Sequence, residues 1–391
     1  MRRGQYTITP RDIHHHAAQL CQRFLGFRDY GPKCTAINVL TVLFYAAARL
    51  ISRAAACASL RDAPCDSAVH AALMAMLPEV GELQRRLNRA LQGDLPQPLR
   101  RRRQTLAIDL LLIPYHGEPL TDPREIYRGQ AKSGTTHFHA YATAYVVKKG
   151  QRFTVALAHV QKGDDLAAVV KELLRQTAKA GVRPRYLLLD RGFYAVSVIR
   201  YLQAARCPFL MPVPCKGRKA DHPKGPGGTR VFHLRKRGGW SQHTLKDGAG
   251  RRATIQICVK CRNLRGERHK HGRQALVYGY WGLEPPSGQW VYESYRLRFG
   301  IESSYRQLHQ GRMRTCTRDP LLRLLYVGIA LLLRNVWVWL HWEVLSRPRR
   351  GGRQVDLNQL VFRKMLVGLQ HLAEALLGIC DEVWSQRPIT T

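Results

Sequence analysis

A single carboxylate, Asp109, lies inside one of the most apolar runs of this chain. Seven apolar residues surround it between Leu106 and Ile113, and the run has no helical period, which predicts a buried strand of a sheet. A lone charge in such a strand costs several kcal/mol unless it is paired or binds a metal. The sequence therefore predicts that Asp109 needs a partner, either a paired group or a bound metal.

A second carboxylate stands at the end of another apolar strand. In RYLLLDRGFY the run ends directly on Asp190, and a glycine and a helical pattern follow. Ligands of open α/β sheets bind at the carboxyl ends of strands, so Asp190 is a candidate functional residue. It also has the position of an N-cap for a helix from Phe193 to Ala204, and the two roles are compatible.

A third acidic candidate lies in the segment YRLRFGIESSYRQLHQ. As a helix, this segment places Tyr295, Arg298, Glu302 and His309 on one stripe. The carboxylate could bind a cation while the guanidinium and the phenol grip phosphate oxygens. The alternative is a solvated helix face on which Glu302 and Arg306 form an i,i+4 ion pair.

These motifs together resemble a known family. Two strand-borne aspartates followed by a helix-borne glutamate are similar to the ligand set of a two-metal nucleotidyl-transfer site on a ribonuclease-H-like sheet. The pattern Y-x2-R-x3-E-x6-H that begins at Tyr295 resembles the Y-R-E-K signature of DDE transposases of bacterial and archaeal insertion sequences. IPYHG after Asp109 and DRGFY at Asp190 resemble members of that group with a β-strand insertion before the glutamate. The resemblance covers roughly residues 104 to 345.

The resemblance implies a catalytic and metal-binding triad. Asp109, Asp190 and Glu302 would hold two Mg²⁺ or Mn²⁺ ions, the cations that a few hard oxygen ligands select. Tyr295 and Arg298 would be the accompanying signature residues that orient the phosphate. Hydrolysis at the element end would free a 3′-OH, which would then attack target DNA in the same site.

One position departs from the family pattern. His309 stands where the family has a lysine expected to contact DNA, and a neutral imidazole lacks a fixed charge at pH 7. Arg306, Arg312 or Arg314 could supply the missing cation. The alternative for His309 is an ordinary surface histidine.

Composition agrees with a nucleic-acid partner. The chain has 63 Lys and Arg against 27 Asp and Glu, a formal net charge of +36, which favours polyanions through counterion release. Double-stranded DNA, as element end and as target, is the expected partner, bound by a homodimer or larger assembly because two ends must be joined. Ten irregularly spaced cysteines and no signal-peptide pattern predict a cytoplasmic, nucleoid-associated protein.

Two other patterns have plain structural interpretations. Cys258-x2-Cys261, with His269 and His271 nearby, invites a zinc site, but QICVKC alternates like a strand and the histidine spacing is not standard. The apolar stretch from Leu321 to Leu345 contains charged residues that are expensive in lipid. It is predicted to be a core helix, with no membrane contact.

The expected organisation is α/β with a helical N-terminal domain and a ribonuclease-H-like mixed five-stranded sheet. A turn at residues 62–64, followed by a helix capped by Asp66 or Ser67, is compatible with a DNA-binding helix-turn-helix that presents Ser67 and His70. We expect a helical domain at 1–92, a basic linker at 93–104, the first part of the catalytic sheet at 105–214, a basic β-strand insertion at 215–289, the glutamate helix and a backing helix at 290–346, and a helical tail at 347–391.

The predicted insertion is strongly basic. Residues 215–275 contain 17 Lys and Arg against 3 Asp and Glu, so the insertion is expected to clamp the element end. Trp290 could stack an unpaired base, a contact of about 1–3 kcal/mol, although core packing is the commoner role of a tryptophan. Two other functions remain open: a nuclease or resolvase on the same fold that does not join DNA, and a transposase-derived DNA-binding protein without catalysis.

Overall fold

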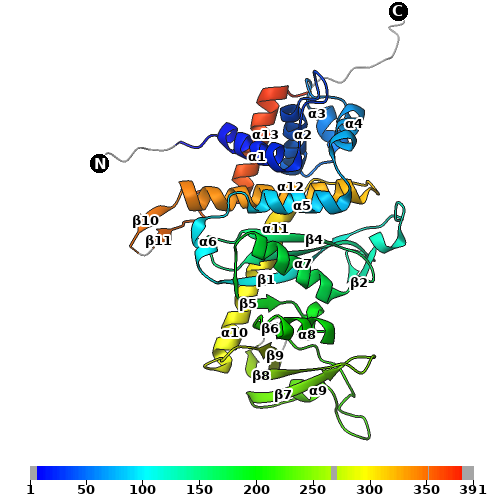
Figure 1. The fold of residues 1–391 in the computed structure, drawn as a ribbon, viewed down its shortest axis with the longest axis vertical. Helices are drawn as coiled ribbons and strands as arrows, with labels where there is room; N and C mark the ends of the chain where they lie inside the picture. The colour runs from blue at the N-terminus through cyan, green and yellow to red at the C-terminus, as the bar shows by residue number, and fades with distance from the viewer. Residues whose placement is uncertain (1–6, 266–270, 351, 381–391) are drawn as a thin grey trace, which may run out of the picture. The chain divides into compact units, whose positions relative to one another are not determined.

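The structure is a computed structural model that describes residues 7–265, 271–350 and 352–380, without the side chains of 264, 265, 271 and 301–303. The chain forms two compact units. One consists of Met1–Asp94 with Arg306–Thr391, and the other of Leu95–Tyr305. The elements of each unit are drawn in Figure 1.

The first unit is helical. It contains α1 (Pro10–Leu25), α2 (Ala36–Arg49), α3 (Arg53–Ser59), α4 (Asp66–Met76), α5 (Val80–Gln92), the end of α11 (Gly300–Gln310), α12 (Pro320–Trp339) with a π turn (Leu340–Val344), the hairpin β10 (Arg347–Arg349) and β11 (Gly352–Gln354), and α13 (Phe362–Leu377). Helix α12 begins where the sequence predicts, because Asp319 caps it and Pro320 occupies its first turn.

The predicted core helix is confirmed. The segment Pro320–Val344 is long and apolar enough to span a membrane, but 94% of its most apolar window is buried in the protein. Asn335 on α12 donates a hydrogen bond of 3.1 Å to the carbonyl of Leu91 at the end of α5. The apolar surface of α12 is therefore covered by protein.

The candidate helix-turn-helix consists of α3 and α4. Ser67 and His70 are exposed on α4, as the prediction requires. The predicted cap is wrong: Cys65 is the N-cap and makes no side-chain capping bond. Asp66 lies in the first helical turn, and its carboxylate binds the Arg53 guanidinium at 2.6 and 3.1 Å. This ion pair joins the two helices.

A buried histidine makes the stability of the helical unit depend on pH. His14 is 5% exposed and its Nε2 lies 2.9 Å from the hydroxyl of Thr41. That hydroxyl donates to the carbonyl of Ile37, so the His14 ring is the donor toward Thr41. Burial lowers the pKa of His14 to about 4, because the interior disfavours the charged ring.

We expect acid to destabilise this unit through His14. The unfolded chain binds the proton near pH 6.5, so stability is lost as pH falls from there toward 4, by about 3 kcal/mol for a shift of this size. Urea unfolding at pH 7 and pH 4 should show that His14→Gln removes this part of the pH dependence. His371→Gln, at an exposed position of α13, should leave it unchanged; equal pH profiles of wild type and His14→Gln would contradict the assignment.

The second unit contains the large sheet. Its strands are β1 (Gln104–Pro114), β2 (Tyr127–Lys132), β3 (Thr135–Val146), β4 (Thr154–Val160), β5 (Pro184–Leu189), β6 (Phe209–Pro212), β7 (Gly239–Lys246), β8 (Arg252–Arg265) and β9 (His271–Trp281). Its helices are α6 (Gln97–Arg101), α7 (Leu166–Lys179), α8 (Val196–Ala204), α9 (Arg230–His233), α10 (Gly288–Arg296) and the start of α11.

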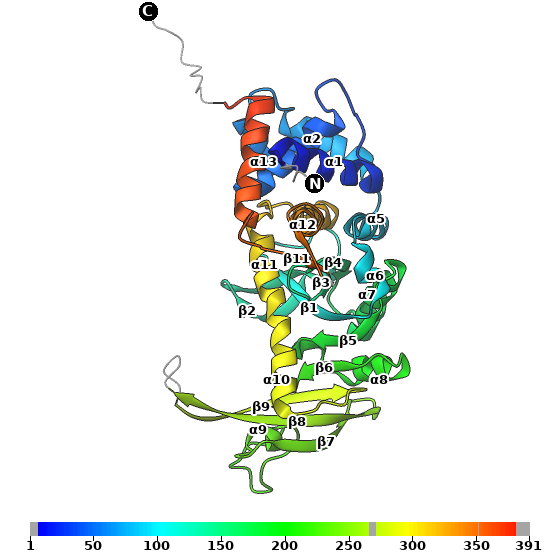
Figure 2. The same ribbon diagram turned by 90° about the vertical axis from the view of Figure 1, so that its left-hand side faces the viewer.

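Five strands form the predicted ribonuclease-H-like sheet. They lie in the order β4-β3-β1-β5-β6, with β3 antiparallel to β1 and β4, and with β5 parallel to β1 and β6. Helix α7 is the predicted crossover to β5, and Asp165 caps it. Helix α10 lies on one face of the sheet, and α7 and α8 lie on the other (Figure 2).

The sheet is larger than predicted. Within the described residues it has nine strands, because β2 pairs with β3 and the three insertion strands continue the sheet beyond β6. The connection is the antiparallel pair β6–β9, in which Phe209 faces Trp281 and Leu210 faces Tyr280. The predicted linker also differs from expectation, since it contains α6, whose Leu99 is fully buried.

Candidate active site

Asp109 has the cationic partner that its position requires. It lies in the middle of β1, opposite Thr143 of β3, and its Oδ2 receives a hydrogen bond of 2.9 Å from Nη1 of Arg298. Both side chains are largely buried, with 14% of Asp109 and 7% of Arg298 exposed. The charge in the apolar strand is therefore compensated by an arginine 189 positions away.

Asp190 converges on the same guanidinium. It follows β5, the parallel neighbour of β1, and its Oδ1 lies 3.6 Å from Nη2 of Arg298. With 40% of its side chain exposed, Asp190 is the more accessible of the two acids. Two carboxylates that are 81 positions apart thus face one cationic group.

The capping role of Asp190 differs from the prediction. Its carboxylate accepts a bond from the backbone of Gly192 and caps the short 3-10 turn Arg191–Phe193. Helix α8 begins later than expected, at Val196, and its N-cap Ala195 makes no side-chain capping bond. The local turn keeps Asp190 at the end of the strand, which is compatible with a catalytic role.

Aromatic side chains hold Arg298 in place. The guanidinium carbon lies 5.4 Å from the ring centre of Tyr295 and 5.5 Å from that of Phe299, distances at which a cation is attracted to a ring face. Tyr295 is 4% exposed and its hydroxyl donates to the carbonyl of Leu189. Burial raises the pKa of Tyr295, so this hydroxyl stays protonated and ties the arginine to the strand that ends at Asp190.

The helical segment is interrupted at Arg298. Helix α10 ends at Arg296, a 3-10 turn spans Leu297–Phe299, and α11 begins at Gly300. The predicted single α-helix is therefore incorrect in detail. The tighter turn brings Arg298 inward, while Leu297 and Phe299 on either side remain 52% and 45% exposed.

Tyr305 belongs to the site although the sequence did not indicate it. Its hydroxyl donates to the main-chain carbonyl of Asp109 at 3.2 Å and lies 2.8 Å from the hydroxyl of Thr143. Burial, followed by the nearby Asp109, raises the pKa of Tyr305 well above its ordinary value, so the phenol remains a donor. Its position one turn after Glu302 was the available signal.

We expect Tyr305→Phe to weaken catalysis through the placement of Asp109. The loss should be about 10-fold or more, the usual effect of removing a group that orients a metal ligand, because the sequence predicts that Asp109 is one. DNA cleavage with Mg²⁺ measures it, and the thermal midpoint controls for folding. Tyr201→Phe removes the same atom on α8 and should leave cleavage at the wild-type rate; an unaffected Tyr305→Phe would contradict the supporting role.

Glu302 lies on α11, but its side chain is outside the described residues. Within the described part, no group of three histidine, cysteine, aspartate or glutamate side chains is arranged to hold a metal. The described geometry of the site is therefore that of Asp109 and Asp190 with Arg298. The third member of the predicted triad stays a prediction.

The other residues predicted to contact DNA belong to both units. Arg306, His309, Arg312 and Arg314 all belong to the helical unit, which begins again at Arg306. Arg306, His309 and Arg314 are exposed and Arg312 is half-buried. Trp290, on α10 of the second unit, is half-buried, and its ring centre lies 6.2 Å from that of Tyr186.

The cysteines of the zinc alternative lie on a regular strand. Cys258 and Cys261 are in β8, paired with β7 and β9, as the alternating pattern predicts. Cys258 is buried, and burial raises its pKa to about 11, which disfavours the thiolate that zinc needs. His269 and the side chain of His271 lie outside the described residues.

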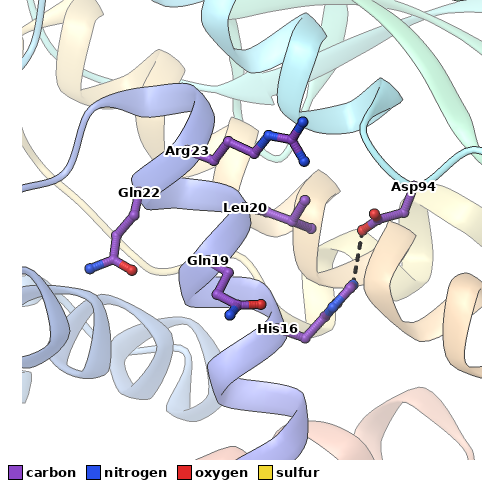
Figure 3. Close-up of a pocket in the computed structure, with 6 residues that line it drawn as sticks. All are labelled: His16, Gln19, Leu20, Gln22, Arg23 and Asp94. Atoms are coloured by element: carbon purple, nitrogen blue, oxygen red, sulfur yellow. Dashed lines mark ion pairs between the residues drawn. The ribbon is translucent and has the colours of Figure 1, made fainter.

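A polar hollow also occurs in the helical unit. It has a volume of about 450 Å³ and is lined by α1 residues and Asp94. His16 and Asp94 point toward one another at one side of it, 2.9 Å apart (Figure 3). The imidazole stacks on Trp339 of α12 at 3.9 Å, so this pair ties α1 to the core helix.

The comparisons with known proteins agree with the fold. The strand order defines a ribonuclease-H-like protein, and the family model for the transposase DDE domain matches residues 100–336. The chain belongs to this family of transposases, whose domain carries out phosphoryl transfer on DNA. The comparison with curated proteins gave no match.

A solved structure shares the architecture. The piggyBac transposase, determined by electron cryo-microscopy as a synaptic complex with hairpin DNA, superposes with a TM-score of 0.52 at 12% identity. The alignment covers 97% of this chain and 82% of that chain. At this identity the likeness concerns the fold.

Proposed function

We propose that this chain is the transposase of a bacterial or archaeal insertion sequence of the Y-R-E-K group, and that Asp109, Asp190 and Glu302 form its active site. It cuts the DNA at the ends of the element and joins the freed 3′-OH to target DNA. The observation that carries the proposal is the convergence of Asp109 and Asp190 on Arg298. The motif around Glu302 and the family membership support it.

The acids are suited to a divalent cation. Asp109 and Asp190 both direct carboxylate oxygens at the Arg298 guanidinium. Their oxygens therefore already stabilise a positive charge, and hard oxygens of this kind are the ligands that divalent cations prefer. With Glu302 they would hold Mg²⁺ or Mn²⁺, two ions in each site. The ions would supply a stronger nucleophile and neutralise charge on the leaving oxygen.

The chain's own groups act mainly by position and charge. Water attacks phosphorus first and the P–O3′ bond breaks; in the joining step the new 3′-OH attacks a target phosphodiester and displaces its 3′ oxygen. Arg298, which faces both acids, would stabilise charge on the transferring phosphate. Tyr295 and Tyr305 keep Arg298 and Asp109 in place, and both phenols stay protonated.

The proposal is tested with DNA that carries the element's end and flanking sequence. Wild type should cleave it only with Mg²⁺ or Mn²⁺, and Glu302→Gln should bind it equally well without cleaving, because the cationic surface is unchanged. Loss of binding together with cleavage would instead indicate a structural role for Glu302. The thermal midpoint of Glu302→Gln, compared with that of wild type, controls for the stability of α11.

The products distinguish the alternatives. Strand-transfer products joined to a target plasmid support transposition, whereas cleavage without joining indicates a nuclease or resolvase. Binding without either reaction, in wild type with metal present, indicates a non-catalytic DNA-binding protein.

The remaining expectations belong to the same proposal. Exposed Ser67 and His70 on α4 would contact the element end, and His309, Arg306 and Arg312 would contact phosphates. Trp290 would stack a base only if it leaves Tyr186. The working form would be a dimer or larger assembly on DNA, in the cytoplasm at the nucleoid.

A further inference from the structure

A cavity of about 520 Å³ lies between the start of α8 and the insertion. Its walls are the segment Tyr194–Val196, the two ends of the loop 216–229, and the residues His243–Asp247 at the end of β7. We call it the β7–α8 cavity. None of the residues nominated for catalysis lines it.

The loop that forms one wall is closed tightly at its neck. Gly217 has φ +107° and Gly228 has φ +61°, and a Cβ on Gly217 would collide with the carbonyl oxygen of Gly227. The Thr229 hydroxyl donates to the carbonyl of Pro214 and accepts a bond from the backbone N–H of Lys216. Lys216 is therefore presented from a fixed backbone position.

The strands beside the cavity are held to α8. The side chain of Gln203 on α8 donates to the carbonyl of Thr254 on β8 at 2.7 Å. The hydroxyl of Thr254 lies 2.9 Å from that of Thr244 on β7. Helix α8 and the insertion strands are thus connected next to Thr244, which lines the cavity.

The charge of the β7–α8 cavity is positive. Lys216 and Lys246 are exposed at its rim. The one acid of the wall, Asp247, is neutralised by Arg251 at 2.7 Å and accepts two backbone N–H bonds. Among the described residues neither lysine has an ion pair, and two such lysines at the rim favour an anion.

The side chain of Tyr194 lines the same cavity. The Tyr194 hydroxyl is buried and has no hydrogen-bond partner among the described residues. Burial raises the pKa of Tyr194, so the phenol keeps its proton. A buried donor without a partner is unfavourable, and an anionic ligand that reaches this hydroxyl would satisfy it.

We propose that the β7–α8 cavity binds phosphates of the DNA backbone close to the cleaved bond. The inference rests on the proposed function, DNA cleavage and strand transfer, and adds a binding site for one strand of the DNA. Tyr194 follows Asp190 by four residues, which limits their separation to about 14 Å. At about 3.4 Å per nucleotide along one strand, the bound phosphates lie within about four nucleotides of the reaction.

The salt dependence of DNA binding tests this inference. The full chain is titrated with a 30-bp duplex at several salt concentrations. The Lys216→Ala/Lys246→Ala variant should bind with a slope of log K against log salt reduced by about 2, because each phosphate contact contributes about 0.9. Tyr194→Phe should weaken binding and keep the slope, because it removes a neutral donor.

Lys171→Ala/Lys179→Ala removes two exposed lysines of α7 and is the matched control, expected to keep the wild-type slope. An unchanged slope in the cavity variant, with DNA cleavage by wild type intact, overturns the cavity inference and leaves the proposed function standing. Failure of wild type itself to bind or cleave DNA overturns the proposed function.

A second measurement identifies the source of the phosphate. Amine modification of wild type, read by mass spectrometry, should show Lys216 and Lys246 protected by the duplex and not by inorganic phosphate. Equal protection by inorganic phosphate would overturn the inference in favour of a small-anion site. Absence of protection by the duplex would overturn it as well.

Discussion

Asp190→Asn should abolish DNA cleavage while DNA binding persists. The substitution removes one proposed metal ligand, so the rate should fall by more than the roughly 10- to 100-fold that loss of a supporting group costs. Binding without metal should be equal or slightly tighter, because a negative charge leaves the DNA site. Gel assays of cleavage and of complex formation on the same terminal DNA measure the two effects separately.

This substitution should not disturb the fold. Asp190 is 40% exposed and its ion pair with Arg298 is long, 3.6 Å, while asparagine can still cap the turn at Gly192. Asp165→Asn is the matched control, because Asp165 also caps a helix and its substitution removes the same charge. Full cleavage by Asp190→Asn, or equal loss in Asp165→Asn, would contradict the role of Asp190.

Of the substitutions considered in the second unit, Arg298→Ala should produce the largest loss of stability. It leaves Asp109 buried without its cation, a change that typically costs about 3 kcal/mol or more. Mg²⁺ should stabilise this variant more than wild type, because the uncompensated carboxylates gain a counter-ion. Urea unfolding with and without Mg²⁺ gives both free energies.

Two controls separate the buried pair from an ordinary charge effect. Arg175→Ala breaks an exposed ion pair with Glu172, whose side chains are 46% and 28% exposed, and should cost less than about 1 kcal/mol. Arg298→Ala/Asp109→Asn should recover part of the stability lost in Arg298→Ala, because no buried charge remains unpaired. Equal stability of Arg298→Ala and Arg175→Ala would show that the pair contributes little.

The sequence predicted the parts of the site that depend on local patterns. The apolar run around Asp109 and the strand that ends at Asp190 can be found because buried strands in such sheets are continuous apolar segments. The crossover α7 has a regular helical period and an acidic cap. These features require only the neighbouring residues, and the structure confirms them.

The remaining features depend on contacts between distant residues. Pairing of β9 with the free edge of β6 makes the insertion part of the same sheet, and no local pattern specifies which edge a strand will choose. Asp109 was expected to be paired or to bind a metal, but the identity of its partner as Arg298 follows from the turn at Leu297–Phe299. Tyr305 reaches Asp109 by the same long-range packing.

Anomalous diffraction from crystals of the full chain containing Mn²⁺ tests the central claim most directly. The account predicts manganese bound by carboxylate oxygens of Asp109, Asp190 and Glu302 together. Manganese bound elsewhere, or at the two aspartates with Glu302 directed away, would contradict the proposed active site.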